Sequence, residues 1–295
     1  MKAFATIAVC AFALFATGPW CAVRAQDGTA QMAHRRSPYV GAIAVEAGSG
    51  RRLLADTPER ECYPASCTKL MTARLLLKAV REGRLSPRDR LVQSRRSAAE
   101  EPSKIDLAVG ETMSVQDALL SLMIKSANDV AVMVAEKLGG SVEAFAEQMN
   151  AEARALGMSR TRFVSPNGLP PAPGSKRGFD VSTAEDLSKL ALAILREQPE
   201  ILEYTSKASA VVKGRGGEPL TIQNHNNLLW KKGVKVPGVD GLKTGYINAG
   251  GSSIVLTGTR AGKRAIVVVT GSSTAGERDR AAGRMLNDAL GALAW

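Results

Sequence analysis

Apolar residues follow two kinds of spacing along the chain. Between residues 66 and 196 they recur every three or four positions, which predicts amphipathic helices. Toward both ends of the chain they form short β-branched runs, which predict strands. This separation predicts an α/β architecture, in which both chain ends form an antiparallel sheet packed with helices. An all-helical lobe is then inserted between the parts of that sheet.

The strand signals make two hairpins and one further strand. In each hairpin, two β-branched runs are joined by a short stretch that contains glycine. The predicted strands are residues 39–46, 51–55, 239–243, 252–259 and 264–270.

The helix signals lie mainly in the middle of the chain. Several of the helical patterns begin at a Ser or Thr that can cap a helix, or end at a glycine. The predicted helices are residues 66–82, 114–123, 129–138, 142–156 and 182–196, and a closing helix at 281–293.

The first 25 residues have the features of an export signal. Lys2 is followed by an apolar stretch over residues 3–16, by helix breakers at 17–19, and by small residues before Ala25. An uncleaved anchor is the alternative, but the apolar stretch is short for a membrane span. We therefore expect cleavage near Ala25, followed by a polar, loose segment at 26–38.

The net positive charge of the chain indicates which kinds of partner to expect. The formal net charge is +11 at pH 7, and loss of the leader removes two basic residues and no acidic one. An exported basic protein is expected to meet the anionic cell envelope. Aromatic residues make up only 4% of the chain, which with the export signal argues against nucleic acid as a partner.

The small number of histidines and cysteines limits the kinds of catalytic or metal site that this chain can form. Only His34 and His225 are present, and beyond the leader only Cys62 and Cys67 remain. These four show no ligand spacing, so no metal and no cofactor is expected, and a Ser-His-Asp triad is hard to build. A Cys62–Cys67 disulfide stays open, although the turn between them disfavours it. Cys67 is more typical of a small buried apolar residue, and His225 of a polar loop.

A nucleophilic serine in this chain needs a base other than histidine. Ser66 and Lys69 stand three positions apart at the start of a predicted helix, so they share one face. Burial and a neighbouring cation would lower the pKa of Lys69 and let it accept the Ser66 proton. Taken alone, this spacing is also what a helix cap and a surface lysine would give.

Two further motifs favour the catalytic interpretation of Ser66 and Lys69 over a helix cap and a surface lysine. Ser126 and Asn128 stand just before a helix too apolar to be exposed, where Ser126 can relay a proton and Asn128 can bind a substrate amide. Lys243, Thr244 and Gly245 end a predicted strand. Lys243 can hold an anionic substrate end and Thr244 adds a hydroxyl, while Gly245 lets a substrate backbone lie close to the strand. A second Ser-x-Asn, residues 165–167, is explained by a proline-rich turn.

Ser-x-x-Lys, Ser-x-Asn and Lys-Thr-Gly in this order form a known motif set of β-lactamases and penicillin-binding proteins. The chain resembles the low-molecular-weight penicillin-binding proteins, the serine-type D-Ala-D-Ala carboxypeptidase family. The resemblance covers about residues 38–290, including residues 64–72, 126–129 and 240–246. It implies the β-lactamase/transpeptidase-like fold and removal of the terminal D-Ala from peptidoglycan stem peptides, in the periplasm or cell wall.

The resemblance also implies a role for each matching residue. The implied catalytic residues are Ser66 as the nucleophile, Lys69 as its base and Ser126 as the proton relay. The implied substrate-binding residues are Asn128, Lys243, Thr244, Gly245 and Tyr246. The backbone N–H groups of Ser66 and Tyr246 are implied to form the oxyanion hole, and β-lactam antibiotics to acylate Ser66.

Larger members of the family carry a C-terminal β-domain and a membrane-binding helix. We expect residues 26–295 to be one catalytic domain with neither of these and with no integral membrane anchor. Two departures, Cys67 and the loop 249–253, leave the substrate preference open. The alternatives are a DD-endopeptidase, a β-lactamase and a wall-binding protein with an inactive site. A β-lactamase is disfavoured because no Glu-x-x-Leu-Asn segment is present.

Overall fold

The computed structural model describes residues 21–24, 30–33 and 37–294 of the chain. Most of the predicted leader, residues 1–20, lies outside the described residues. Two short strands, β1 (Cys21–Arg24) and β2 (Ala30–Ala33), precede the main fold. The predicted loose segment at 26–38 is therefore wrong for the four residues of β2.

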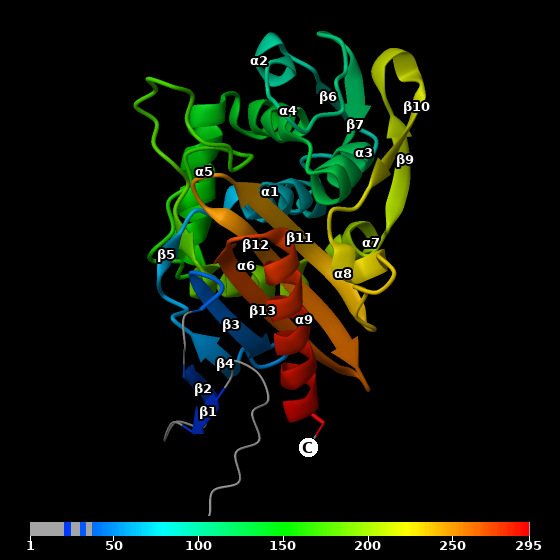
Figure 1. Cartoon of the computed structure of the whole chain (residues 1–295). Coiled ribbons are helices and arrows are strands. Elements are labelled where there is room, and N and C mark those ends of the chain that lie inside the picture. Colours follow the sequence, from blue (N-terminus) through cyan, green and yellow to red (C-terminus); the bar gives the residue numbers. More distant parts are fainter. Residues whose placement is uncertain (1–20, 25–29, 34–36, 295) are drawn as a thin grey trace, which may run out of the picture.

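A seven-stranded sheet forms the base of the molecule, in the order β1-β2-β4-β3-β13-β12-β11 (Figure 1). All of its pairings are antiparallel except the one between β2 and β4. Both ends of the chain contribute strands, as predicted. The strands of the two chain ends are β3 (Gly41–Glu46), β4 (Arg52–Asp56), β11 (Val239–Ile247), β12 (Gly251–Arg260) and β13 (Lys263–Ser272).

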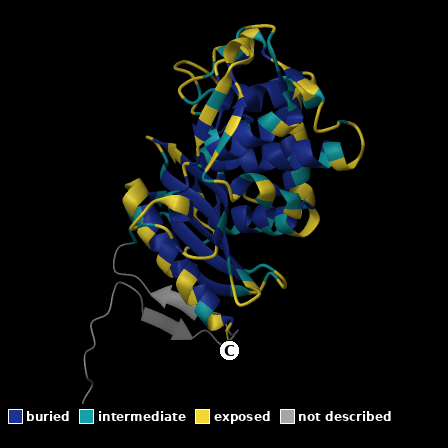
Figure 2. Cartoon of the chain, turned by 90° about the vertical axis from the view of Figure 1, so that its right-hand side faces the viewer, coloured by how far each residue is buried: buried dark blue, intermediate teal, exposed yellow. Residues whose placement is uncertain are grey.

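Helices cover both faces of this sheet. Alternate residues of β13 enter two different cores: Val267 packs in the core that includes α9 (Ala275–Ala292), whereas Val268 packs in the core that includes α6 (Ala184–Glu197). A strand buried on both faces has a continuous apolar run, which is why β12 and β13 were readily predicted. Figure 2 shows the buried residues running without a break from the sheet into the helical part.

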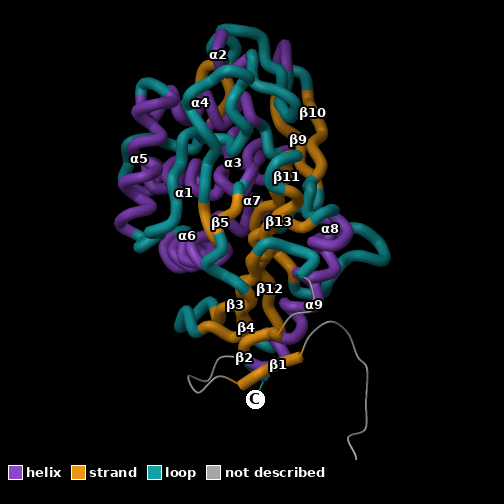
Figure 3. The backbone as a smooth tube through the Cα atoms, turned by 60° about the vertical axis from the view of Figure 1, so that its left-hand side comes forward, coloured by secondary structure: helices purple, strands orange, loops and turns teal. Residues whose placement is uncertain are grey.

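The inserted lobe is built around α4, which is buried along most of its length. Short two-stranded ribbons accompany the helices (Figure 3), and the expectation of an all-helical lobe left these out. The helices are α1 (Lys69–Arg81), α2 (Arg95–Ala98), α3 (Val115–Leu120), α4 (Asn128–Gly139), α5 (Val142–Ala155), α7 (Leu202–Thr205) and α8 (Asn227–Trp230). The ribbons pair β5 (Glu61–Cys62) with β8 (Ser182–Thr183), β6 (Arg90–Val92) with β7 (Thr112–Ser114), and β9 (Ser209–Lys213) with β10 (Pro219–Gln223).

Several helices begin directly after a Ser or Thr whose side chain caps the helix. The Ser114 side chain accepts a hydrogen bond from the N–H of Asp117 at the start of α3. At α6 the cap is Thr183, one residue after the predicted Ser182. The closing helix begins at Ala275, six residues before the predicted 281, because the Thr274 hydroxyl caps it through the N–H of Glu277.

Candidate active site

The predicted site residues come together where the lobe meets the last strand of the sheet. A cleft of about 270 Å³ lies there. Ser66 reaches it from a 3₁₀ turn, Ala65–Thr68, which leads directly into α1. The predicted residues that line the cleft are Ser66, Ser126, Asn128, Thr244, Gly245 and Tyr246. The other two, Lys69 and Lys243, are buried directly beside them.

Lys69 lies within hydrogen-bonding distance of the predicted nucleophile. Its Nζ atom is 3.0 Å from Oγ of Ser66, as the one-turn spacing predicted. It also donates hydrogen bonds to Oδ1 of Asn128 at 2.7 Å and to the backbone carbonyl of Asn167 at 2.8 Å. The whole Lys69 side chain is inaccessible to solvent. Lys69 is therefore not a solvated surface lysine.

Burial and charge both act on the protonation state of Lys69. Burial, the larger cause, lowers its pKa well below the usual lysine value, and the positive charge of Lys243 lowers it further. Burial also lowers the pKa of Lys243, to about 8, and Arg278 adds to this effect. Burial thus disfavours the charged form of both lysines.

The Asn128 side chain links Lys69 to the rest of the cleft. While its side-chain oxygen accepts from Lys69, its Nδ2 donates to the carbonyl of Glu101 at 3.1 Å. One N–H of this amide still remains for a ligand in the cleft. Ser126, two residues earlier, has left-handed backbone angles (φ 61°, ψ 36°) at the end of a π-helical turn, Ser121–Lys125. Such angles are unusual for a non-glycine residue and cluster at functional sites.

Gly245 is needed by the Ser66 segment itself. A Cβ atom at this position would lie 2.8 Å from the carbonyl oxygen of Pro64 and 3.0 Å from the backbone nitrogen of Ser66. The sequence interpretation gave Gly245 a different purpose, close approach of a substrate. The structure adds that a side chain here would displace the backbone at Ser66.

Strand β11 is at the end of the sheet and pairs with β12 on one side only. The other side of an edge strand presents N–H and C=O groups that an extended peptide can pair with. Lys243, Thr244, Gly245 and Tyr246 all lie on this strand. The Tyr246 side chain is 59% exposed at the cleft, and its hydroxyl donates to Oδ1 of Asn248.

A buried carboxylate anchors the loop that reaches Lys69. Asp180 accepts hydrogen bonds from the N–H groups of Val164 and Ser165 and from the Ser165 hydroxyl. Ser165 also accepts from the N–H of Gly168, so the predicted turn is present. Nothing in the residue pattern predicts that the Asn167 carbonyl in this turn contacts Lys69.

Among the cleft residues that were not predicted as site residues, two are titratable. His225, which was interpreted as part of a polar loop, lines the cleft, and burial together with the charge of Lys243 lowers its pKa to about 4. Arg278 is buried and also lines the cleft, although its guanidinium donates to Asp279 at 2.7 Å. Arg278 lies before the predicted start of the closing helix, which hid its helical position.

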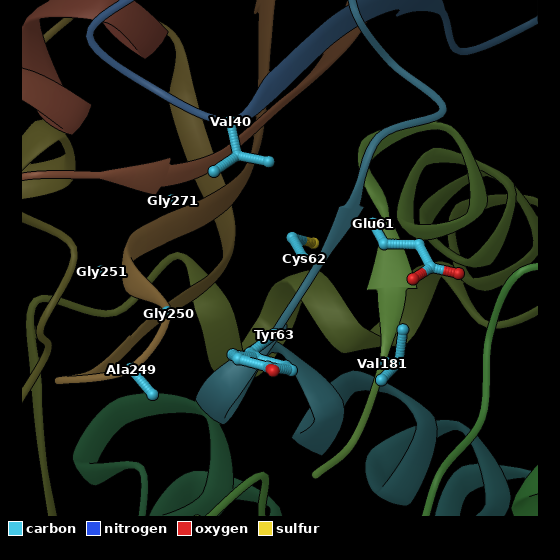
Figure 4. A pocket seen from close by; sticks show the side chains of 9 residues that line it. All are labelled: Val40, Glu61, Cys62, Tyr63, Val181, Ala249, Gly250, Gly251 and Gly271. Atoms are coloured by element: carbon cyan, nitrogen blue, oxygen red, sulfur yellow. The ribbon is translucent and has the colours of Figure 1, made fainter.

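Cys62 and Cys67 are buried and do not form a disulfide. Cys67 follows Ser66 as a small buried residue, as predicted, and burial raises its pKa to about 11. Cys62 lines a separate pocket of about 510 Å³, and Figure 4 shows Val40, Tyr63 and Ala249 among the other residues that line it. Burial raises the Cys62 pKa to about 12. Neither thiol has the thiolate character that a nucleophile requires.

The described residues contain neither a cluster of metal ligands nor a helix that could span a membrane. Across these ranges, no group of His, Cys, Asp and Glu side chains is arranged to hold a metal ion. None of the helices described for this chain has both the length and the apolar character needed to cross a membrane.

Known proteins match both the sequence and the fold. A family model described as D-alanyl-D-alanine carboxypeptidase, peptidase family S11, matches residues 31–274. D-alanyl-D-alanine carboxypeptidase DacF of Bacillus subtilis is 32% identical over 267 residues, which cover 90% of this chain and 65% of that protein. A D-alanyl-D-alanine endopeptidase of Pseudomonas aeruginosa is 31% identical over 221 residues, covering 74% of this chain and 66% of that protein. This chain therefore spans slightly less than two thirds of each relative.

Solved structures agree with the sequence matches. Penicillin-binding protein D2 of Listeria monocytogenes, in a cefotaxime-bound form, superposes with a TM-score of 0.74 at 30% identity. The match covers 87% of this chain and 99% of that one. Fold and site thus define a protein of the penicillin-binding, transpeptidase-like class. Within that class, the chain belongs to the D-alanyl-D-alanine carboxypeptidase family, peptidase family S11.

Proposed function

We propose that this protein is a serine-type D-Ala-D-Ala carboxypeptidase that acts through an acyl-enzyme on Ser66. It removes the terminal D-Ala from peptidoglycan stem pentapeptides and needs no cofactor. The observation that carries this proposal is the hydrogen-bonding arrangement around Lys69. Family membership and the position of Lys243 beside the same cleft support it.

The bonds around Lys69 suit a neutral amine. A neutral amine has two N–H groups and one lone pair, and two carbonyl oxygens already accept from Nζ, those of Asn128 and Asn167. The lone pair is then left for the Ser66 hydroxyl at 3.0 Å. Lys69 takes this proton as Oγ of Ser66 attacks the carbonyl carbon of the penultimate D-Ala.

The remaining steps complete the transfer. The C–N bond breaks, and Ser126 passes a proton to the departing amine of the terminal D-Ala. Water then attacks the acyl-enzyme, releases the shortened peptide and restores the Ser66 hydroxyl. The negative charge that develops on the carbonyl oxygen is stabilised by the backbone N–H groups of Ser66 and Tyr246.

The substrate lies along the free edge of β11. Its terminal carboxylate binds Lys243 and Thr244, and Asn128 holds the amide of the acyl chain. Gly245 keeps the strand close to the nucleophile's backbone. This placement is supported by the lining of the cleft, where Thr244 and Asn128 are both present.

β-Lactams acylate the same serine because they resemble the D-Ala-D-Ala end. The cefotaxime-bound form of the Listeria monocytogenes protein supports this part of the proposal. The expected export signal and the substrate place the enzyme in the periplasm or cell wall. It therefore meets the peptidoglycan stem peptide there as its partner.

A β-lactamase would need a base that hydrolyses the acyl-enzyme rapidly. No Asp or Glu of the described chain lines the catalytic cleft. Glu100, a half-buried carboxylate near Lys69, accepts a hydrogen bond from the Asn167 side chain instead. We therefore expect β-lactam acyl-enzymes to persist.

Release of D-Ala tests the proposal directly. The wild-type protein is incubated with a synthetic peptide ending in D-Ala-D-Ala and with its D-Ala-L-Ala counterpart, and free alanine is measured. We expect the wild type to release the terminal alanine from the first peptide only, and Ser66→Ala to release it from neither. Equal activity of Ser66→Ala and wild type would overturn the proposal.

A further inference from the structure

Two consecutive residues after α2, Glu100 and Glu101, contact the two groups that accept hydrogen bonds from Lys69. Lys69 donates to Oδ1 of Asn128 and to the backbone carbonyl of Asn167. The Glu101 carbonyl accepts from Nδ2 of Asn128 at 3.1 Å. Oε2 of Glu100 accepts from Nδ2 of Asn167 at 2.9 Å. Both acceptors of the base are therefore held by one short segment of the chain.

The loop that carries Asn167 packs directly against the catalytic turn and α1. A Cβ atom at Gly168 would collide with the carbonyl oxygen of Ala65. On the other side of Asn167, the carbonyl of Pro166 accepts from the Thr72 hydroxyl at 2.6 Å. These contacts fix the residues before and after Asn167. The direction of the Asn167 carbonyl then depends on how this residue is oriented between them.

The Asn167 side chain is buried, and both of its polar groups are bonded. Its Oδ1 atom accepts from the N–H of Leu169 at 3.1 Å, while its Nδ2 group donates to Glu100. Glu100 lies 67 residues earlier in the sequence. Without its carboxylate, the buried Nδ2 group would lose this partner, which is costly enough to favour a different orientation of Asn167.

We propose that Glu100 is a positioning residue for the general base. It holds Asn167 in the orientation in which the backbone carbonyl accepts one N–H of Lys69, so that the lone pair of the amine stays directed at Ser66. This inference rests on the proposed function, because it concerns the same base. Glu100 is not among the residues that line the catalytic cleft, so it acts through Asn167 and not on the substrate.

The charge of Glu100 also acts on Lys69. Burial lowers the pKa of Lys69 most, and the charge of Lys243 lowers it further. Asp180, Cys67 and Glu100 oppose this effect and raise the pKa. A neutral residue in place of Glu100 should therefore lower the pKa of Lys69 still more.

Glu100 lines a groove of about 680 Å³ beside the cleft. The charged side chains that face Glu100 or line this groove with it are Lys69, Arg96, Glu101, Glu143 and Arg177. Burial raises the pKa of Glu100, while the hydrogen bond from Asn167 and the three cations lower it. Because Glu100 itself titrates, the pH comparison below uses Glu100→Gln, which is neutral at every pH.

The rate of benzylpenicillin acylation in Glu100 variants tests the inference. Glu100→Ala removes the acceptor of Asn167. We expect acylation to slow by about tenfold, because the loop keeps its other anchors and a full misplacement of about 1 Å can cost about 10²-fold. Glu100→Gln keeps a neutral acceptor and should slow acylation less. Asn167→Ala removes the same hydrogen bond from the other side, so the double variant Glu100→Ala, Asn167→Ala should be no slower than Asn167→Ala alone.

The pH profile separates this role from a merely structural one. Glu100→Gln removes a negative charge near Lys69, so the acid limb of the acylation rate should move to lower pH. Glu147→Ala and Glu147→Gln make the same changes at an exposed residue of α5 and are the controls. Neither control should change the rate or the position of the acid limb.

Three results would each overturn the inference: a wild-type rate in Glu100→Ala, additive losses in the double variant, or an unmoved acid limb in Glu100→Gln. Melting temperatures show whether each variant folds. If Glu100→Ala does not, the pH profile of Glu100→Gln decides the question. A wild-type protein that forms no penicillin adduct would instead refute the proposed function, whatever the Glu100 variants do.

Discussion

The Nζ atom of Lys69 lies 3.0 Å from Oγ of Ser66, and no part of the Lys69 side chain reaches solvent. A charged lysine is costly to bury without an acidic partner. Two carbonyl oxygens accept from Lys69. Burial and a second buried lysine lower its pKa more than the nearby carboxylates of Asp180 and Glu100 raise it. This surrounding favours the neutral amine, which is the form that a general base requires.

Replacing Lys69 by Met should remove the base while keeping its volume. We expect the rate of penicillin acylation to fall by about 10²–10⁴, the usual contribution of general base catalysis. The melting temperature is measured alongside, because Met leaves the buried oxygens of Asn128 and Asn167 without their Lys69 donor. Lys78→Met, a half-exposed lysine on the same helix, is the control and should acylate at the wild-type rate. Near-normal acylation by Lys69→Met would contradict the assigned role.

The two lysines predict a bell-shaped pH profile for kcat/KM. Acylation needs Lys69 neutral, so the rate falls toward low pH as Lys69 gains a proton. Carboxylate binding needs Lys243 charged, so the rate also falls at high pH, around the Lys243 pKa of about 8. Lys243→Arg keeps its charge at all these values and should move the alkaline limb to higher pH. An unchanged alkaline limb in that variant would assign the limb to another group.

Gly245→Ala should damage the nucleophile's position rather than the fold. The added Cβ would meet the carbonyl of Pro64 at 2.8 Å and the nitrogen of Ser66 at 3.0 Å. We expect acylation to slow by about 100- to 1000-fold, the range seen when one oxyanion donor is lost. Gly48→Ala, at a position with no atom within 4 Å of a new Cβ, is the control. Stopped-flow acylation of both variants gives the comparison, and equal rates would contradict the close-approach argument.

Asp180→Asn should loosen the loop that supplies the Asn167 carbonyl. The Asp180 carboxylate accepts from two backbone N–H groups and from the hydroxyls of Ser165 and Thr68. An amide accepts through one oxygen only, so the two hydroxyls would have to rotate and accept from its NH2 group. We expect the free energy of unfolding to fall by about 1–3 kcal/mol, because hydrogen bonds to a charged group are replaced by weaker neutral ones. Acylation should slow as well. Denaturant unfolding measures the first effect, with the exposed Glu203→Gln as a control that should change neither quantity.

The sequence could predict the parts of the site that depend on local spacing. Ser66 and Lys69 are one helical turn apart, so their contact follows from three residues of separation. The Asn167 carbonyl lies 98 residues from Lys69 in sequence, and a backbone oxygen leaves no mark in a residue pattern. Its Ser-Pro-Asn segment was explained correctly as a turn, but the partner of that turn required the folded chain.

The elements of the fold, too, could be predicted only where the local residue pattern is strong. Strands buried on both faces, such as β12 and β13, have continuous apolar runs and were predicted. The ribbon of β9 and β10 was missed because each strand buries only one residue, Val212 and Ile222 respectively. Weak alternation of this kind cannot be separated from a loop without knowing what packs against it.

Intact-mass spectrometry after incubation with benzylpenicillin tests the central claim most directly. The account predicts that the wild-type protein gains the mass of one penicillin molecule and that peptide mapping locates it on Ser66. Ser66→Ala should gain nothing, and Lys69→Met should acquire the adduct only slowly. A wild-type protein that forms no adduct, or an adduct that persists undiminished in Ser66→Ala, would contradict the account.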